Sequence, residues 1–320
     1  MKIKKITVKS LYGSLDFEWE FDKSVNILAG INGSYKTTLL SIIKQITLHE
    51  NVKYPVASVE AEYYDGIKIV FTRKESDVQT LLANREENKV VVEKIEKDHP
   101  NWFVDENMRK VRLSIVSYNF EKDGKSLDQQ TYDLVRKIDF ISTFDVASER
   151  DKESVLNVIL LKLQEQYAYY LSDLAKQVSD KVQESGNVTK EQVNAINKYK
   201  NEFIGIVNET FKETGKILSE KESSLSFLKG ENQIIKPFNL SAGEKQVLII
   251  LLTVLLERRQ EYILIMDEPE ISMHIDMQYA LIDNLRKLNP NAQFILSTHS
   301  PAIFGSGWGN KVVYSESLLK

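Results

Sequence analysis

The residues best suited to chemistry form one short loop, Gly30-Ile31-Asn32-Gly33-Ser34-Tyr35-Lys36-Thr37-Thr38. An apolar run typical of a buried strand precedes the loop at residues 25–29. An apolar stripe with the spacing of one helix face follows it, at Leu39, Ile42, Ile43 and Ile46. A strand, a glycine loop ending in Lys-Thr and a helix together hold a nucleoside triphosphate. We expect the backbone N–H groups and Lys36 to face the phosphates, and the Thr37 hydroxyl to face Mg²⁺.

One residue of the loop departs from this pattern. The pattern has Gly directly before the Lys, where Tyr35 stands in this chain. A glycine there permits positive φ and a close backbone approach, and a tyrosine restricts both. The loop alone therefore leaves two interpretations open, a phosphate site and an ordinary strand–turn–helix.

Three later segments carry further polar groups. The first, Asn239-Leu240-Ser241-Ala242-Gly243-Glu244-Lys245-Gln246, opens an apolar helix at 247–256. Its Ser at a helix start is either a simple N-cap or part of an anion site.

The second segment follows the apolar residues 263–266 and reads Asp267-Glu268-Pro269-Glu270. Asp267 is suited to Mg²⁺ and Glu268 to taking a proton from water, although paired acids also cap helices.

The third segment is Ser297-Thr298-His299-Ser300-Pro301, after the apolar residues 294–296. His299 is suited to donating a hydrogen bond to a γ-phosphate, and the alternative is a structural histidine. Because buried parallel strands end at one sheet edge, we expect His299 to lie beside Asp267 and Glu268. His274 receives a supporting role at most.

The elements that must position these residues change along the chain. Residues 1–29 alternate as β-structure, and Asp65-Gly66 between two β-rich runs predicts a hairpin at 59–72. Further strands are predicted at 90–92 and 111–118. The last third returns to α/β, with a helix at 276–288 between two buried strands.

The middle of the chain is predicted to be helical. Apolar residues recur at three- and four-residue steps from Leu156 to Val178, and Thr189-Lys190-Glu191-Gln192 has the form of a capping box for a second helix. The pair would form an antiparallel hairpin about 40 Å long, at roughly 1.5 Å per residue. Two interpretations stay open, a lobe packed on the core and a protruding partner-binding arm.

Composition limits the class of protein. The chain has 320 residues, 42% hydrophobic and 28% charged, a net charge of −4 and no cysteine. Disulfides and thiol chemistry are excluded, and the charge argues against coating nucleic acid, although a local basic groove stays open. The N-terminus has no signal-peptide pattern, and the longest apolar run is too short for a membrane helix. We expect a cytoplasmic protein without membrane contact.

Taken together, the segments GINGSYKTT, LSAGEKQ, ILIMDEPE…MH and ILSTHSP resemble the ABC-type ATPase head, in the RecF, Rad50/SMC and OLD branch. The resemblance covers residues 1–48 and 237–310 well. It implies an α/β P-loop fold with a mixed antiparallel β lobe, a parallel core sheet and an inserted helical hairpin lobe. The implied domains are an N-terminal lobe (1–149) with Walker A, a helical insertion, lid or short arm (150–236), and a C-terminal lobe (237–320) with the signature, Walker B and His switch.

The resemblance also implies a reaction and an assembly. ATP with Mg²⁺ would lie between two copies of the chain in a head-to-head dimer. Walker A of one copy and the signature of the other would enclose each nucleotide. The implied nucleotide contacts are Gly30, Asn32, Gly33, Ser34, Tyr35, Lys36, Thr37, Thr38, Ser241, Gly243 and Glu244. Thr37 and Asp267 would hold the metal, Lys36 would bridge the β- and γ-phosphates, Glu268 would activate water, and His299 would sense the γ-phosphate.

Departures from the family's pattern are Tyr35 and Ala242. Tyr118, Asn119 and Gln130 are open candidates for the Q-loop position. Only 21 residues follow His299, so we expect no Toprim nuclease and instead a separate effector, a nuclease or toxin, in bacterial anti-phage defence. The alternatives are a slow or non-hydrolysing ATP-binding scaffold and a RecF-like DNA-repair clamp.

Overall fold

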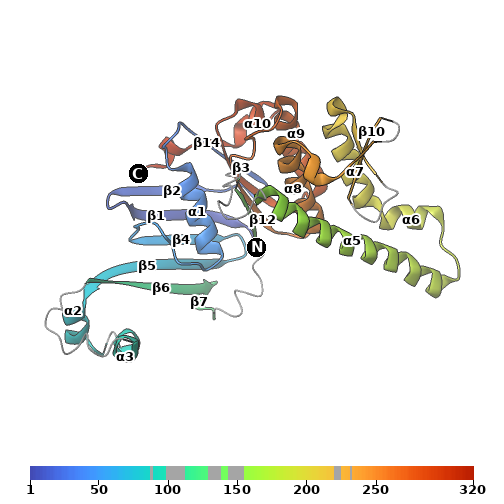
Figure 1. Ribbon diagram of the computed structural model, residues 1–320. Coiled ribbons are helices and arrows are strands. Elements are labelled where there is room, and N and C mark those ends of the chain that lie inside the picture. The colour runs from blue at the N-terminus through green and yellow to red at the C-terminus, as the bar shows by residue number, and fades with distance from the viewer. Residues whose placement is uncertain (87–88, 99–111, 129–137, 143–154, 220–224, 231–232) are drawn as a thin grey trace.

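The computed structural model describes residues 1–86, 89–98, 112–128, 138–142, 155–219, 225–230 and 233–320. Two sheets share the helix α1 (Lys36–Thr47), and a group of helices covers the far side of the second sheet (Figure 1). The structure therefore confirms an α/β fold with an antiparallel lobe, a parallel core sheet and a helical lobe.

The first sheet is antiparallel, in the order β2-β1-β4-β5-β6-β7. Its strands are β1 (Ile3–Leu11), β2 (Leu15–Glu20), β4 (Ser58–Tyr63), β5 (Ile67–Asp77), β6 (Arg112–Lys122) and β7 (Lys125–Ser126). Alternate residues of β2 and β4 are buried, as the period-2 pattern predicts. The buried side chains pack against the apolar face of α1. The predicted hairpin is confirmed, because β4 and β5 pair around a turn in which Gly66 has φ 80°.

The strand predicted at residues 90–92 is wrong, because these residues lie in the helix α3 (Lys89–Asp98), which follows α2 (Val78–Ala83). The three valines were read by their β propensity alone. The residues after them carry a Glu93–Lys97 pair at i,i+4 spacing, which favours a helix.

The second sheet is parallel, in the order β14-β3-β13-β12-β8. Its strands are β3 (Val25–Ala29), β8 (Ile138–Ser142), β12 (Ile263–Asp267), β13 (Gln293–Thr298) and β14 (Val312–Tyr314). Every residue of β3, β12 and β13 is buried, which explains their unbroken apolar runs. In register, Thr298 pairs with Ala29 and Ser297 with Asp267. The residues that follow these strands therefore meet at one edge.

The helical lobe packs on the core and also extends beyond it (Figure 1). The helix α5 (Val155–Ser185) contacts α8 (Ala242–Leu256) through its first half, whereas residues 179–187 are exposed. The capping box at Thr189 is present, but the predicted second helix is divided at Asn197 into α6 (Lys190–Ile196) and α7 (Lys198–Thr210). The helix α7 packs on α8 and on α9 (Ile275–Leu288).

A small antiparallel sheet connects this lobe to α8. Its strands are β9 (Lys216–Leu218), β10 (Phe227–Lys229) and β11 (Gln233–Ile235), in the order β11-β10-β9. No sequence pattern predicts this sheet, because strands of three residues are too short for a periodic pattern. Short helices complete the chain: η3 (Lys212–Thr214), η4 (Pro237–Asn239), α10 (Pro301–Gly305), η5 (Gly309–Lys311) and η6 (Ser315–Leu318).

Candidate functional site

The glycine loop runs from β3 into α1, as predicted. Gly30 has φ +153°, and a Cβ placed there would lie 2.3 Å from the Ser315 hydroxyl and 2.7 Å from that of Ser34. Only glycine therefore fits between the loop and the segment that follows β14. In that segment, the Glu316 carboxylate accepts a hydrogen bond from the Ile31 N–H, a contact that no local sequence pattern predicts.

Tyr35 precedes the first residue of α1 and has the left-handed backbone that a glycine would adopt there, with φ 65°. A side chain in this conformation costs about 1–2 kcal/mol. Its ring lies 6.0 Å from that of Tyr12 and 5.8 Å from that of Phe17. The loop thus keeps the backbone of a phosphate loop, and aromatic packing offsets the strain.

Lys36 lies under the loop with only 4% of its surface exposed. Its Nζ donates to the carbonyl oxygens of Gly30 at 3.1 Å and Ile31 at 2.9 Å. Burial lowers the pKa of Lys36, and the nearby carboxylates of Glu268 and Glu316 partly oppose that shift. Both hydrogen-bond partners are neutral carbonyl groups, so the side chain lies directly under the loop without a direct ion pair to either partner.

The two predicted metal ligands lie together. Thr37 Oγ1 donates to Asp267 Oδ1 at 3.3 Å, and Ser297 Oγ donates to the same oxygen at 2.5 Å. Asp267 is 1% exposed, at the end of β12. A hydroxyl and a carboxylate at hydrogen-bond distance are hard oxygen donors of the kind Mg²⁺ prefers, so these residues fit that ion.

Glu268 and His299 also meet, from the ends of neighbouring strands. His299 Nε2 and Glu268 Oε1 are 2.9 Å apart. Glu268 has a left-handed backbone with φ 48°, and its N–H donates to the Ser297 hydroxyl at 3.0 Å. Both side chains are partly exposed, at 18% for Glu268 and 32% for His299, so water reaches the pair.

Glu270 is a site neighbour that the sequence analysis named only as part of a motif. It is buried, and its Oε1 accepts from Thr298 Oγ1 at 2.6 Å, His299 N at 2.9 Å and Ser300 N at 3.3 Å. Its only signal in the sequence is a third acid two residues after Glu268.

The predicted signature begins α8 as expected from its Ser. The Ser241 hydroxyl accepts from the Glu244 N–H at 3.3 Å, and the Glu244 carboxylate accepts from the Ser241 N–H at 2.9 Å, which is a capping box. Glu244 is 2% exposed, and its other oxygen accepts from Lys216 Nζ at 2.5 Å and Thr214 Oγ1 at 2.8 Å. The carboxylate thus bonds within its own chain, and its contact with a nucleotide stays a prediction.

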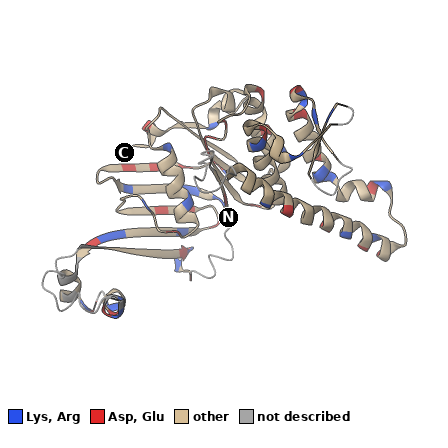
Figure 2. Ribbon diagram, in the orientation of Figure 1, with Lys and Arg blue, Asp and Glu red and all other residues tan. Residues whose placement is uncertain are grey.

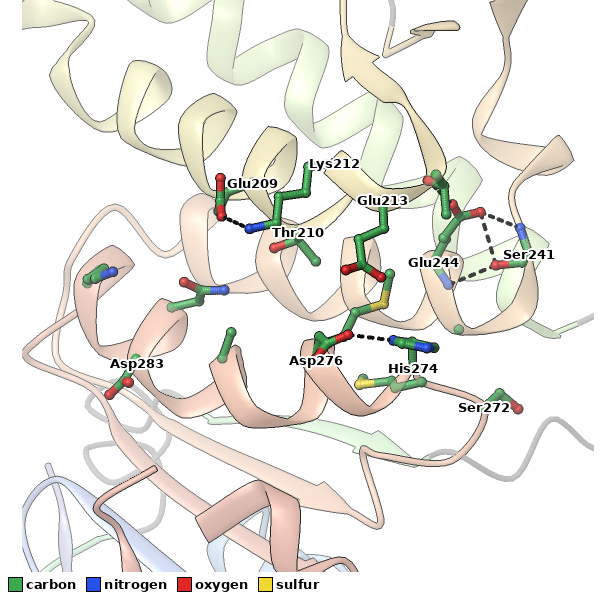
Figure 3. Close-up of a pocket in the computed structure, with 17 residues that line it drawn as sticks. Glu209, Thr210, Lys212, Glu213, Ser241, Glu244, Ser272, His274, Asp276 and Asp283 are labelled. Atoms are coloured by element: carbon green, nitrogen blue, oxygen red, sulfur yellow. Dashed lines mark hydrogen bonds and ion pairs between the residues drawn. The ribbon is translucent and has the colours of Figure 1, made fainter. Parts of the chain in front are cut away.

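The signature lines a separate cavity of about 950 Å³ between α7 and α9 (Figure 3). Ser241, Gly243 and His274 lie on its wall. His274 precedes α9, and its Nδ1 is 3.0 Å from the Asp276 carboxylate. Among its described interactions, His274 makes no contact with the loop that carries Lys36. Walker A and the signature of one chain therefore do not line the same cavity.

The Q-loop candidates lie elsewhere. Tyr118 is on β6, and its hydroxyl donates to the Glu50 carbonyl, just beyond the C-terminus of α1. That end is about 18 Å from Lys36, at 1.5 Å per residue of helix. Asn119, the next residue of β6, lines a surface pocket together with Tyr118 near this end of α1. Neither residue therefore lies near Lys36, where a Q-loop residue would be needed. Gln130 lies outside the described residues.

The fold is that of an ABC-type ATPase head and is similar to the head domains of SMC proteins. One similar solved structure is the crystal structure of an SMC head bound to the C-winged helix domain of ScpA. The two sequences are 13% identical, and the structures superpose with a TM-score of 0.52 over 96% of this chain and 92% of that one. The fold assignment rests on this comparison. The SMC head domain from Thermotoga maritima is 15% identical over 96% of this chain and 92% of that one, with a TM-score of 0.48.

The chain belongs to the AAA ATPase domain family, which matches residues 44–304. The match begins inside α1, after the glycine loop, so the loop is assigned from its geometry. The comparison with curated proteins gave no match. Within the described residues, no helix has the length and apolar character needed to cross a membrane.

Proposed function

We propose that this chain binds and hydrolyses ATP with Mg²⁺. The observation that carries the proposal is the convergence of Lys36, Thr37, Asp267, Glu268 and His299 at one edge of the parallel sheet. These residues come from three segments, of which the first is about 230 positions from the second and the second about 30 from the third. Each residue has the side chain that phosphoryl transfer needs.

Each residue has a separate task in this proposal. The loop N–H groups and Lys36 bind the phosphates, and Thr37 and Asp267 hold Mg²⁺, which supplies positive charge to the phosphate oxygens. Glu268 accepts the proton of an attacking water, and His299 donates a hydrogen bond to the γ-phosphate. Because Glu268 and His299 are in direct contact, both side chains would lie beside the same terminal phosphate.

Turnover of ATP by Glu268→Gln tests this assignment. We expect turnover to fall by about 10²–10⁴-fold, because the amide accepts no proton, while MgADP still binds. The matched control is Glu121→Gln, which removes the same charge from an exposed position on β6. Equal turnover of wild type and Glu268→Gln would rule out Glu268 as the base.

The position of the signature supports a dimer as the active form. Ser241 and Gly243 line a cavity apart from their own Walker A loop, so a second copy could bring its signature to the nucleotide. ATP would then favour association, and hydrolysis would release it.

A slow or non-hydrolysing scaffold is the second candidate, favoured by Tyr35. Its side chain and left-handed backbone stand where the loop pattern has glycine, beside the phosphate-binding Lys36. Near-zero turnover by wild type, Glu268→Gln and Tyr35→Gly alike, together with ATP binding, would select the scaffold.

The remaining parts of the proposal concern partners. Lys and Arg are interspersed with Asp and Glu along α5 and across the antiparallel sheet, so neither of these two elements offers a uniformly basic stretch to a DNA clamp (Figure 2). We therefore favour control of a separate nuclease or toxin in anti-phage defence, which rests on the resemblance of the motifs. A nuclease or toxin gene beside this one would support that role, and ATP-dependent, salt-sensitive DNA binding would favour the clamp.

A further inference from the structure

The turns that follow β12 and β13 are tied by hydrogen bonds in both directions. From the β13 side, Ser297 donates to Asp267 Oδ1, and its hydroxyl and carbonyl oxygens accept from the Glu268 N–H at 3.0 and 3.2 Å. From the β12 side, Glu270 Oε1 accepts from Thr298, His299 and Ser300. Each turn therefore holds the backbone of the catalytic residue in the other, Glu268 or His299.

We infer that Glu270 is a positioning residue for hydrolysis, which fixes the turn that carries His299 and so sets its contact with Glu268. This inference rests on the proposed function and names a residue to which that function gives no task.

Three donors converge on one buried oxygen, which makes the turn depend on Glu270. The N–H groups of His299 and Ser300 are consecutive, and the Thr298 hydroxyl completes the set. Without the carboxylate, the buried Thr298 hydroxyl and the partly buried His299 N–H lose this acceptor, whereas the Ser300 N–H keeps the Thr298 hydroxyl at 2.9 Å. Each buried group left unsatisfied costs about 1–3 kcal/mol. The turn would then adopt another conformation, and His299 would move with it.

The opposite turn is also unfavourable by itself. Glu268 has φ 48°, a backbone conformation that residues other than glycine rarely adopt. Its N–H donates hydrogen bonds to the hydroxyl and carbonyl oxygens of Ser297, which stabilise this conformation. The 2.9 Å contact between Glu268 and His299 is thus a product of both sets of hydrogen bonds. Because a displacement of about 1 Å in a catalytic group can reduce a rate by 10²-fold, loosening one turn reduces turnover.

Glu270 makes no hydrogen bond to the glycine loop among its described contacts, and its charge acts on Lys36 less than those of Glu268 and Glu316. Nucleotide affinity is therefore a readout that depends only weakly on Glu270. Its second oxygen, Oε2, is buried without a hydrogen-bond partner. A glutamine can therefore offer its carbonyl oxygen to the same three donors and place its amide nitrogen where Oε2 lies. This makes Glu270→Gln the conservative variant and Glu270→Ala the disruptive one.

The experiment measures ATP turnover, MgADP affinity by calorimetry, and thermal stability for wild type and both variants. We expect the turnover of Glu270→Ala to fall by roughly 30-fold while the MgADP dissociation constant changes by less than about threefold. Glu270→Gln should stay within about fivefold of wild-type turnover. Val59→Ala, a buried change on β4 far from these turns in the fold, shows what general destabilisation does to turnover.

Three results would overturn the inference while leaving the proposed function intact. They are wild-type turnover in Glu270→Ala, a loss of MgADP affinity in step with turnover, and an equal loss in Val59→Ala. No turnover by wild type would overturn the proposed hydrolysis and this inference together. If Glu270→Ala does not fold, a drop in Glu270→Gln turnover as large as that of Glu268→Gln would also contradict the inference, because the glutamine keeps the acceptor.

Discussion

Gly243, in the first turn of α8, has no room for a side chain. A Cβ there would lie 2.0 Å from the carbonyl oxygen of Ser272 and 3.1 Å from Cα of Met273, both backbone atoms of the segment that follows Walker B. The signature turn therefore packs directly on that segment, and only glycine permits it.

Gly243→Ala should accordingly destabilise the protein by about 3 kcal/mol or more, because α8 must move to relieve the overlap. The matched control is Gly205→Ala on the exposed side of α7, where nothing lies within 4 Å of the new Cβ. That change should stabilise the protein by about 0.5–1 kcal/mol, since alanine favours a helix. Chemical denaturation measures both. A Gly243→Ala protein as stable as wild type would show that the turn can adapt.

Tyr35 combines strain and packing at one residue. Tyr35→Gly would relieve about 1–2 kcal/mol of backbone strain but would lose a ring packed on Tyr12 and Phe17, worth about 2–3 kcal/mol. We expect a net loss of about 1 kcal/mol in unfolding free energy, and a change within about 0.5 kcal/mol for Tyr35→Phe, which keeps the ring. A more stable Tyr35→Gly protein would show that strain outweighs packing.

At the scale of elements, Glu244 links the first turn of α8 to η3 and β9. Burial raises the pKa of its carboxyl, but the hydrogen bonds from Lys216, Ser241 and Thr214 outweigh burial, so the folded pKa lies below the ordinary value of 4.5. A depressed carboxyl pKa stabilises the fold above the unfolded pKa, and this stabilisation disappears as the pH falls through the folded pKa.

Glu244→Gln should therefore lower the free energy of unfolding at pH 7 by about 2–3 kcal/mol, since it leaves the largely buried Lys216 without its counter-charge. The difference from wild type should shrink as the pH falls below 4.5. Denaturation at pH 7, 5 and 4 measures it. A difference that stays constant with pH would mean that the charge of Glu244 contributes nothing.

At the scale of the whole molecule, the separation of Walker A from the signature predicts complementation between copies. Lys36→Ala and Ser241→Arg should each be inactive alone. In a homodimer of the first variant both sites lack an intact Walker A loop, and in a homodimer of the second both lack an intact signature. Mixed dimers hold one intact site, built from the wild-type Walker A of one copy and the wild-type signature of the other. An equimolar mixture should thus recover roughly a quarter of wild-type turnover, given random pairing and independent sites. No recovery, with ATP binding intact in Ser241→Arg, would contradict the composite site.

Much of the candidate site followed from local patterns. The glycine loop, the N-cap at Ser241, the capping box at Thr189 and the Asp65-Gly66 hairpin each depend on residues within a few positions of one another. The convergence of Lys36, Asp267 and His299 also followed, because unbroken apolar runs predict buried parallel strands that end at one edge. The β propensity of the valines at 90–92 predicts a strand where the structure has a helix, and the capping box at Thr189 predicts where a helix begins but not its break at Asn197.

The amino-acid sequence is sufficient to identify the reactive side chains, since their types and short spacings carry the chemistry. Their supporting partners are known only from the folded structure: Glu270 under the turn of His299, Ser297 beside Asp267, Lys216 against Glu244, and Ser315 against Gly30. The difference arises from distance along the chain. These partners are about 30 to 285 residues apart, and no local period relates them. They meet only because strand pairing and helix packing place the two segments side by side.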